Sequence, residues 1–316
     1  MFNTVHGLAT TFFSDNLQKA VLDNNALWDE LRQRITWLPL PATNSREAKQ
    51  MRIAACIGAL GSMLAGLIFV PVYVEPDSGE ITRLLSQLAF YDEKREIHLR
   101  SVLLAAMSHE QEMIREKRAI IIVETIYNIF GRLLHDDRKD LFKAKVQDAC
   151  RVAVKSWEFV RHAEIKVDTL YPPFDPTEET ASEFTYRNWV PIRLTPPGTP
   201  PEKSSEQNGS PKSKGSPKTN GAGRKTERGG GREDSPPPTN GVQIDELQFG
   251  HSDIQRPLWP AFGIGDQELA KGYVLLNSQS TPARQEMGNR RMQRQSMRNS
   301  SMSRPPSSAF LVNLRS

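Results

Sequence analysis

Apolar residues in the first half of the chain recur at three- and four-residue steps, the spacing that places side chains on one face of a helix. Ile81, Leu84, Leu85 and Leu88 follow this spacing, and no alternating pattern of comparable length predicts a strand. We therefore expect an all-α fold, an irregular bundle of about five to six helices. The expected helices are a short one capped by Ser14 or Asp15 and longer ones over roughly residues 28–38, 47–70, 78–91, 92–106, 108–133 and 137–160. Asn44 and Glu47 are expected to cap the helix over residues 47–70, and Val102 is expected to face inward in the helix over residues 92–106.

The stretch from Ile53 to Val74 contains no charged residue. About 20 apolar residues suffice to cross a bilayer, and basic residues precede the run, so a membrane span is one interpretation. The other is the buried central helix of a soluble bundle, because Pro71 shortens the helical run and the later helices each need a partner for one apolar stripe. Small residues at every fourth position predict a close helix contact in either case. They are Ala54, Gly58, Ser62 and Gly66.

The composition changes near LYPPFDP, Leu170 to Pro176, where apolar repeats give way to Pro, Gly, Ser, Asn and Lys. Residues 195–241 bury too little apolar surface to offset a backbone ordering cost of roughly 1–2 kcal/mol per residue. We predict a helical domain over residues 1–170 and an extended segment over 171–194 that packs on the domain or leaves it. Residues 195–316 are expected to form a long disordered C-terminal tail.

The formal net charge of the 316-residue chain is +4, which is too small for the field of a dedicated nucleic-acid binder. The basic excess is local, because residues 277–316 contain seven arginines and a single acid, Glu286. Cys56 and Cys150 lie in apolar helical patterns without a Cys-x-x-Cys pair, which indicates reduced, buried thiols. The N-terminus lacks the features of a secretory signal. We expect a cytoplasmic or nuclear protein, with a membrane location as the alternative.

Residues able to catalyse a reaction or bind a metal show no recognisable spacing. HEQEM at His109 lacks the second histidine of a metalloprotease helix, and the glycines of the uncharged run lie inside a predicted helix instead of preceding one. His135, Asp136 and Asp137 are expected to cap a helix. We therefore predict no catalytic, cofactor-binding or metal-binding residue, and no cofactor.

Seven hydroxyl residues have the local sequence of kinase sites. Six of them precede a proline, and the seventh follows an arginine at a spacing that basophilic kinases favour. Each phosphate would add about −1.5 to −2 charges to a basic tail. The candidate phosphorylation sites are Thr195, Thr199, Ser210, Ser216, Ser235, Thr281 and Ser301.

Three short apolar segments interrupt the polar tail: VQIDELQF, RPLWPAFGI and SSAFLVNL. Segments of this kind are captured by a groove on a partner or fold back on their own domain, and the sequence leaves both outcomes open. The candidate docking residues are Val242, Ile244, Leu247, Phe249, Trp259, Phe262, Phe310 and Leu311.

The order of segments carries a resemblance over residues 45–190. A small-residue helix runs into FVPVYVEPDSGEI, and then RLLSQLAFYDEKREIHLRSVLLA, a Glu-Gln turn and a Trp-bearing helix follow. This order resembles helical regions of functionally uncharacterised filamentous-fungal proteins. The resemblance implies a soluble, all-helical module and implies no activity.

Together these features predict a non-catalytic interaction, scaffold or regulatory protein with unidentified protein partners. Two alternatives stay open. One is a single-pass membrane-associated protein anchored by residues 53–70. The other is a nucleic-acid-associated protein whose basic tail, including RGGGR at residues 228–232, contacts phosphates.

Overall fold

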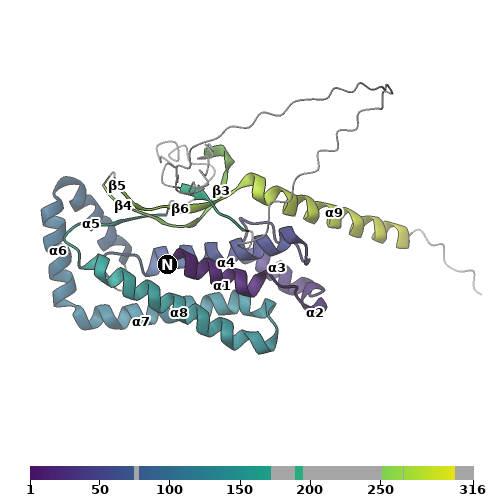
Figure 1. The fold of residues 1–316 in the computed structure, drawn as a ribbon, viewed down its shortest axis with the longest axis horizontal. Helices are drawn as coiled ribbons and strands as arrows, with labels where there is room; N and C mark the ends of the chain where they lie inside the picture. Colours follow the sequence, from purple (N-terminus) through teal and green to yellow (C-terminus); the bar gives the residue numbers. More distant parts are fainter. Residues whose placement is uncertain (75–77, 172–188, 195–250, 266, 303–316) are drawn as a thin grey trace, which may run out of the picture. The chain divides into compact units, whose positions relative to one another are not determined.

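The computed structural model describes residues 1–74, 78–171, 189–194, 251–265 and 267–302, and most of these residues are helical (Figure 1). Eight α-helices and one short 3-10 helix, η1, lie in the described residues before position 162. Their bounds are α1 (Phe2–Phe13), α2 (Lys19–Leu22), α3 (Asn25–Arg34), α4 (Arg46–Leu67), α5 (Ser78–Tyr91), α6 (Glu93–Ala106), α7 (Ser108–Phe130), η1 (Gly131–Leu133) and α8 (Asp136–Arg161).

The all-α prediction is right only at the level of a mostly helical chain, because two small three-stranded sheets accompany the helices. The remaining described elements are β1 (Asp168–Leu170), β2 (Trp189–Pro191), the 3-10 helix η4 (His251–Asp253), β3 (Ile254–Trp259), β4 (Ala261–Ile264), β5 (Gln267–Ala270), β6 (Gly272–Leu276) and α9 (Asn277–Met302). The strand order is β1-β4-β5 in one sheet and β2-β6-β3 in the other, and the pairing is antiparallel except between β2 and β6.

The first helix, α1, lies outside the helices predicted from the sequence. Its apolar residues Val5, Leu8, Phe12 and Phe13 are buried and form one face, which packs on α4 and α8. The rings of Phe12 and Phe142 meet edge to face at 5.1 Å, a favourable geometry for aromatic pairs. The N-terminal segment is therefore part of the core.

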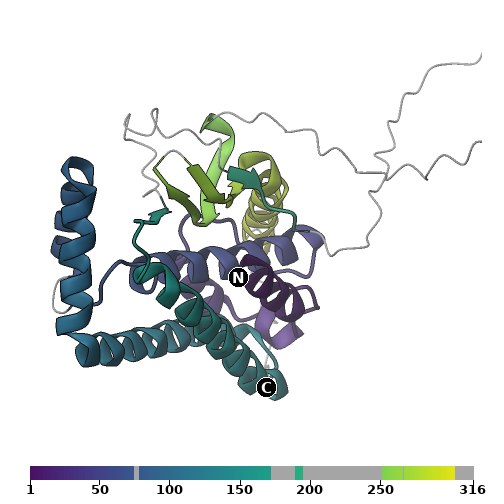
Figure 2. The same ribbon diagram turned by 60° about the vertical axis from the view of Figure 1, so that its left-hand side comes forward.

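Helix α4 holds the uncharged run and lies at the centre of the fold. Helices α1 and α7 contact it, and strand β3 packs along it as well. In Figure 1 and Figure 2 the strands lie on one side of α4, and α7 and α8 lie on the other. Most residues of α4 are buried, which matches an element that is apolar around its whole circumference.

The end of α4 and the turn after it are fixed by side-chain hydrogen bonds, three of which come from other helices. A helix leaves its last carbonyl groups without partners, and buried carbonyls of this kind need donors. Four donors serve residues 67–71: Arg118 to Leu67, Tyr73 to Ile68, Trp157 to Val70 and Arg161 to Pro71, at 3.2, 2.9, 2.9 and 3.3 Å.

Tyr73 stands between two of these arginines. The guanidinium carbons of Arg161 and Arg118 lie 4.0 and 5.3 Å from the centre of its ring, within cation–π range. Burial raises the pKa of the Tyr73 hydroxyl, so the ring stays neutral at physiological pH. Arginines of α7 and α8 thus lock the turn after α4 into the helical body.

Helices α5 and α6 form a hairpin with a small apolar core of its own. Leu85, Leu104 and Val72 are buried at its centre. The sequence pattern predicted Val102 on the inner face of α6, and this prediction is wrong because Val102 is exposed. The buried face of α6 contains an ion pair instead, in which Arg100 lies 2.9 Å from Glu96 and both side chains are buried.

Arg100 also joins the hairpin to the end of α8. Its guanidinium donates to the carbonyl groups of Arg161 and Ala163. Cations are favourable at a helix C-terminus, where unpaired carbonyls concentrate negative partial charge. The buried charged residues of α6 therefore have a structural role, because they provide a partner for the C-terminus of α8.

Residues 251–302 depart from the predicted disordered tail, because they form β3 to β6 and α9. Leu258, Trp259, Leu275 and Ala283 belong to the same buried cluster as the residues of α1 and α4. The predicted domain boundary at residue 195 would therefore divide a single core into two parts. In the predicted extended segment 171–194, residues 189–191 form β2, and Ile192 and Leu194 pack on the domain.

Candidate functional site

A polar junction joins the N-terminus of α4 to the C-terminal helix α9. Asn44 was expected in the pair that caps α4, but the observed cap is Ser45, whose hydroxyl accepts from the backbone N–H of Ala48 at 3.0 Å. Asn44 instead bonds the backbone N–H and carbonyl of Leu17, at 2.7 and 2.9 Å. The capping role thus moves by one residue because Asn44 holds the chain after α1.

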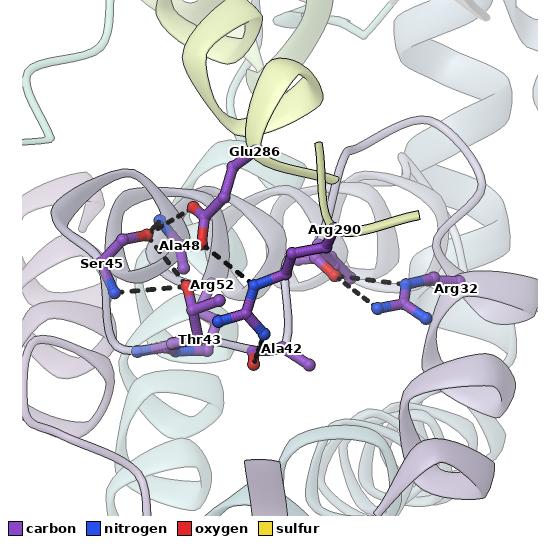
Figure 3. Close-up of polar contacts among 9 residues, drawn as sticks. Arg32, Ala42, Thr43, Ser45, Ala48, Arg52, Glu286 and Arg290 are labelled. Atoms are coloured by element: carbon purple, nitrogen blue, oxygen red, sulfur yellow. Dashed lines mark hydrogen bonds and ion pairs between the residues drawn. The ribbon is translucent and has the colours of Figure 1, made fainter. Parts of the chain in front are cut away.

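The carboxylate of Glu286, on α9, lies at this helix N-terminus (Figure 3). The Ser45 hydroxyl donates to Glu286 Oε2 at 2.6 Å. One turn later on α9, Arg290 donates to the carbonyl of Ala42 at 3.0 Å and lies 3.9 Å from Glu286 Oε1. Negative charge is stabilised where helix N–H groups point outward, so Glu286 complements the dipole of α4.

Arg52 lies beneath this contact and is fully buried, with an exposed fraction of 0%. It follows Ser45 by seven residues and so lies on the same face of α4. Its Nη1 donates to the carbonyl of Thr43 at 2.7 Å, whereas Nε and Nη2 have no hydrogen-bond partner among the described residues. Figure 3 shows Arg52, Thr43 and Ser45 gathered under the turn of α9 that carries Glu286.

Burial lowers the pKa of Arg52 to about 10, and the negative charge of Glu286 opposes that change. Arg52 therefore keeps its proton at neutral pH and places a positive charge in the interior. A buried charge without full hydrogen bonding is costly, so an anion near it is stabilising. The structure supplies that anion from a helix 234 residues further along the chain, the difference between positions 286 and 52.

The loop before α4 is also held from its other side. Arg32, on α3, donates through Nε and Nη2 to the carbonyl of Leu40, at 3.2 and 3.1 Å. Gln255, on β3, donates to the carbonyl of Trp37 at 2.7 Å. These bonds fix the position of the loop that presents Thr43 and Ser45 to α9.

A second candidate surface lies at the turn of the α5–α6 hairpin. Phe90 and Tyr91 are each 83% exposed, and their rings meet edge to face at 5.1 Å. Leu84 and Val102 are also exposed on the same hairpin. Apolar side chains that gather on a surface mark interaction sites more often than apolar side chains that stand alone.

The predicted packing stripe on α4 divides into two pairs. Ala54 and Gly58 are buried, whereas Ser62 and Gly66 are exposed, so the predicted stripe is wrong in its second half. The close neighbours are also a loop and a strand instead of a helix, because a Cβ added to Gly58 would lie 2.7 Å from the side chain of Trp37 and 3.0 Å from that of Leu258 on β3.

Of the predicted docking residues, Trp259 and Phe262 lie within the described residues. Trp259 is buried in the main core, and Phe262 packs against that core, with its ring centre 5.4 Å from that of Phe69. This favours the outcome in which the segment folds back on its own domain. The other six lie outside the described residues: Val242, Ile244, Leu247, Phe249, Phe310 and Leu311.

Of the predicted phosphorylation sites, Thr281 is exposed on α9, and its hydroxyl donates to the carbonyl of Asn277 at 2.8 Å. Ser301 lies in α9, but its side chain is not among those described. The remaining five lie outside the described residues: Thr195, Thr199, Ser210, Ser216 and Ser235.

Sequence reasoning missed the residues of the α4–α9 junction, although two signals were present. Arg52 is the charge closest to an otherwise apolar run, at helical spacing from a capping residue. Glu286 is the single acid of residues 277–316. A charged residue beside an apolar run, or an acid within a basic segment, often has a specific partner. Here Arg52 and Glu286 lie on opposite sides of the α4–α9 junction.

The predictions about reactive groups concern cysteines, histidines and metals. Both cysteines are free and buried, as expected, and burial raises the pKa of Cys150 to about 12. His135 caps α8 by accepting from the backbone N–H of Asp137, which confirms its predicted role. No cluster of three His, Cys, Asp or Glu side chains suited to a metal occurs among the described residues.

One helix of the described residues, α4, is long and apolar enough to cross a membrane, and 61% of its most apolar stretch is buried within the fold. The resemblance to helical regions of filamentous-fungal proteins stays a prediction. No protein-family model, curated protein or solved structure matches this chain.

Proposed function

We propose that this chain is a non-catalytic protein-interaction module that binds a protein partner through its α5–α6 hairpin. The observation that carries the proposal is the pair Phe90 and Tyr91, each 83% exposed at the turn of the hairpin. Aromatic residues dominate the binding energy of protein interfaces, and removing one at the centre of an interface commonly costs 2 kcal/mol or more. Their exposure in a chain with an extensive core supports a role in binding.

The attachment of the hairpin supports the same proposal. The buried pair Glu96 and Arg100, together with the bonds from Arg100 to the end of α8, fixes the direction in which the hairpin extends. A rigid binding element loses less conformational entropy when the partner binds. The aromatic pair is therefore presented on a preorganised support.

The C-terminal helix adds a regulatory part to the proposal. Thr281 is exposed on α9, five residues before Glu286, which contacts Ser45 of the loop before α4. A phosphate on Thr281 would add negative charge to the same helix and weaken that contact through like-charge repulsion. We also propose a cytoplasmic or nuclear location, because 61% of the most apolar stretch of α4 is buried within the fold, as expected of a core helix.

A photocrosslinking experiment on the full chain tests the binding surface. A photoreactive phenylalanine replaces Phe90 in one version and, in the control, Phe159, an aromatic residue of α8 that is 74% exposed. We expect discrete adducts with one protein from position 90, loss of those adducts when Tyr91→Ser is added, and none from position 159. Equal labelling at both positions would refute the assignment of the hairpin.

Fractionation of the same cells separates the two alternatives. We expect the chain to be released from membranes by alkaline carbonate, and the adducts to survive nuclease treatment. Retention in the carbonate-resistant pellet would replace the proposal with membrane anchoring through residues 53–70. Loss of the adducts with nuclease would replace it with nucleic-acid association.

A further inference from the structure

The N-terminus of α4 combines several groups that favour an anion. Helix α4 has 22 residues, and a helix of this length concentrates about half a positive elementary charge at its first turn. The hydroxyl of Ser45 lies at that turn and already donates to a carboxylate oxygen at 2.6 Å. Backbone N–H groups and hydroxyls of this kind form the usual cradle for phosphate and carboxylate groups.

Arg52 is a second and independent sign of a ligand. The side chain is fully buried, it uses Nη1 on the carbonyl of Thr43, and its Nε and Nη2 have no partner among the described residues. The free Nε and Nη2 are the pair that binds two oxygens of one carboxylate or phosphate. Because buried donors are almost always paired, two unpaired donors on one buried cation indicate that this position is suited to an oxyanion.

Glu286 occupies only part of this site. Its carboxylate is bonded to Ser45, and no bond or ion pair within 4.0 Å joins it to Arg52 among the described contacts. The Arg290 side chain that accompanies it is half exposed, so its 3.9 Å contact with Glu286 is screened by water and adds little to this junction. The Ser45 hydroxyl is therefore the main partner of the Glu286 carboxylate among the described contacts.

We propose that the N-terminus of α4, with Ser45 and Arg52, is a binding site for a phosphate- or carboxylate-bearing ligand, and that Glu286 is its internal occupant. Arg52 is covered in this structure, so an external ligand reaches it when the turn of α9 moves aside. A phosphate has three acceptor oxygens, which suffice for the Ser45 hydroxyl and both free donors of Arg52. Ligand binding and release of α9 from the loop are thus linked.

The test uses the full chain with Glu286→Gln, which removes the internal anion and keeps the shape of the side chain. Thermal unfolding is measured in inorganic phosphate and in sodium chloride of equal ionic strength. We expect phosphate to raise the melting temperature of E286Q by roughly 3–6 °C at ten times its dissociation constant. The rise in the melting temperature of wild type should be at least tenfold smaller, because the Glu286 carboxylate competes with phosphate for the site.

Matched variants separate site binding from general salt effects. Glu268→Gln, on the exposed strand β5, removes one acid elsewhere and should behave as wild type. In the E286Q background, Ser45→Ala should weaken phosphate binding about tenfold, and Arg52→Met should abolish it. If Arg52→Met does not fold, the Ser45→Ala comparison and the phosphorus NMR shift of bound phosphate decide the question.

Replacing inorganic phosphate by acetate distinguishes the two ligand chemistries. A response of E286Q to phosphate alone assigns a phosphate group, and a response to acetate as well assigns a simple oxyanion site. Equal responses of E286Q, E268Q and wild type, or no response in any of them, would overturn the proposal.

Discussion

Gly61 is the position where the packing of the fold can be tested most directly. A Cβ added to Gly61 would lie 2.2 Å from the carbonyl oxygen of Leu258 and 3.4 Å from the Cα of Trp259. A carbon and a carbonyl oxygen approach each other to about 3.3–3.6 Å, so strand β3 would have to move by roughly 1 Å. Gly66 lies on the same helix with nothing within 4 Å of an added Cβ.

The comparison of Gly61→Ala with Gly66→Ala isolates this contact. Alanine stabilises a helix by about 0.8–1.0 kcal/mol relative to glycine, and both variants receive that contribution. Displacing a backbone in a packed core costs up to about 3 kcal/mol. We therefore expect G61A to lower the free energy of unfolding by roughly 2 kcal/mol and G66A to raise it by up to about 1 kcal/mol.

Thermal and urea unfolding of the full chain, followed by circular dichroism, measure the difference. At roughly 2–4 °C per kcal/mol for a domain of this size, G61A should melt about 4–8 °C lower and G66A about 2–4 °C higher than wild type. If both variants became more stable by the same amount, β3 would not lie on α4, and the core described above would be wrong.

Three further perturbations have defined outcomes. Glu96→Gln should destabilise the fold by about 3–5 kcal/mol, because it leaves the buried cation of Arg100 unpaired. Amide hydrogen exchange should then rise first in α5 and α6, and unchanged exchange there would contradict the role of the ion pair. Trp259→Ala should cost about 3–5 kcal/mol, whereas Phe90→Ala should stay within about 0.5 kcal/mol, and similar melting temperatures for the two would contradict their assigned burial. The pKa of Cys150 is raised to about 12 by burial, so its thiol stabilises the fold below the unfolded pKa of about 8.5 and loses that contribution as pH rises toward 12. Wild type should lose about 1.4 kcal/mol per pH unit relative to Cys150→Ala above roughly pH 9, and parallel stability curves would refute this.

Helical periodicity predicted the later helices well because their apolar positions face a single core. In α8, Phe142, Val146, Ala149, Ala153 and Trp157 are buried as the spacing predicts. The pattern failed in α6, where the inner face is an ion pair. Periodicity counts apolar residues and cannot detect a polar side chain that is buried because it pairs with a helix terminus.

The two sheets escaped prediction for a different reason. Each strand in the described residues has three to six residues, and β3 contains Pro257, which argues against a strand in a sequence. The pairing of β3 with β6 shifts register beside Pro257, so the missing N–H falls at an irregularity of the ladder. Short strands of this kind are stabilised by partners distant in the sequence, which local patterns do not record.

The candidate site was accessible from the sequence only in fragments. Ser45 and Arg52 are seven residues apart on one helix, and a wheel places them on one face. Glu286 lies on α9, within a region whose composition predicts disorder, so no local signal connects it to α4. The junction is a property of the fold, since it forms when α9 packs beside the loop before α4.

The placement of β3 on α4 also determines when this protein can complete its core during synthesis. The surface of α4 at Gly58 and Gly61 is contacted by Leu258, which leaves the ribosome almost 200 residues later. At about 5–20 residues per second, this surface of the nascent chain stays without that cover for roughly 10–40 seconds. A shortened translation product that ends before β3 would expose this surface permanently and become a substrate for chaperones or proteases, even though it contains the eight α-helices described before residue 162.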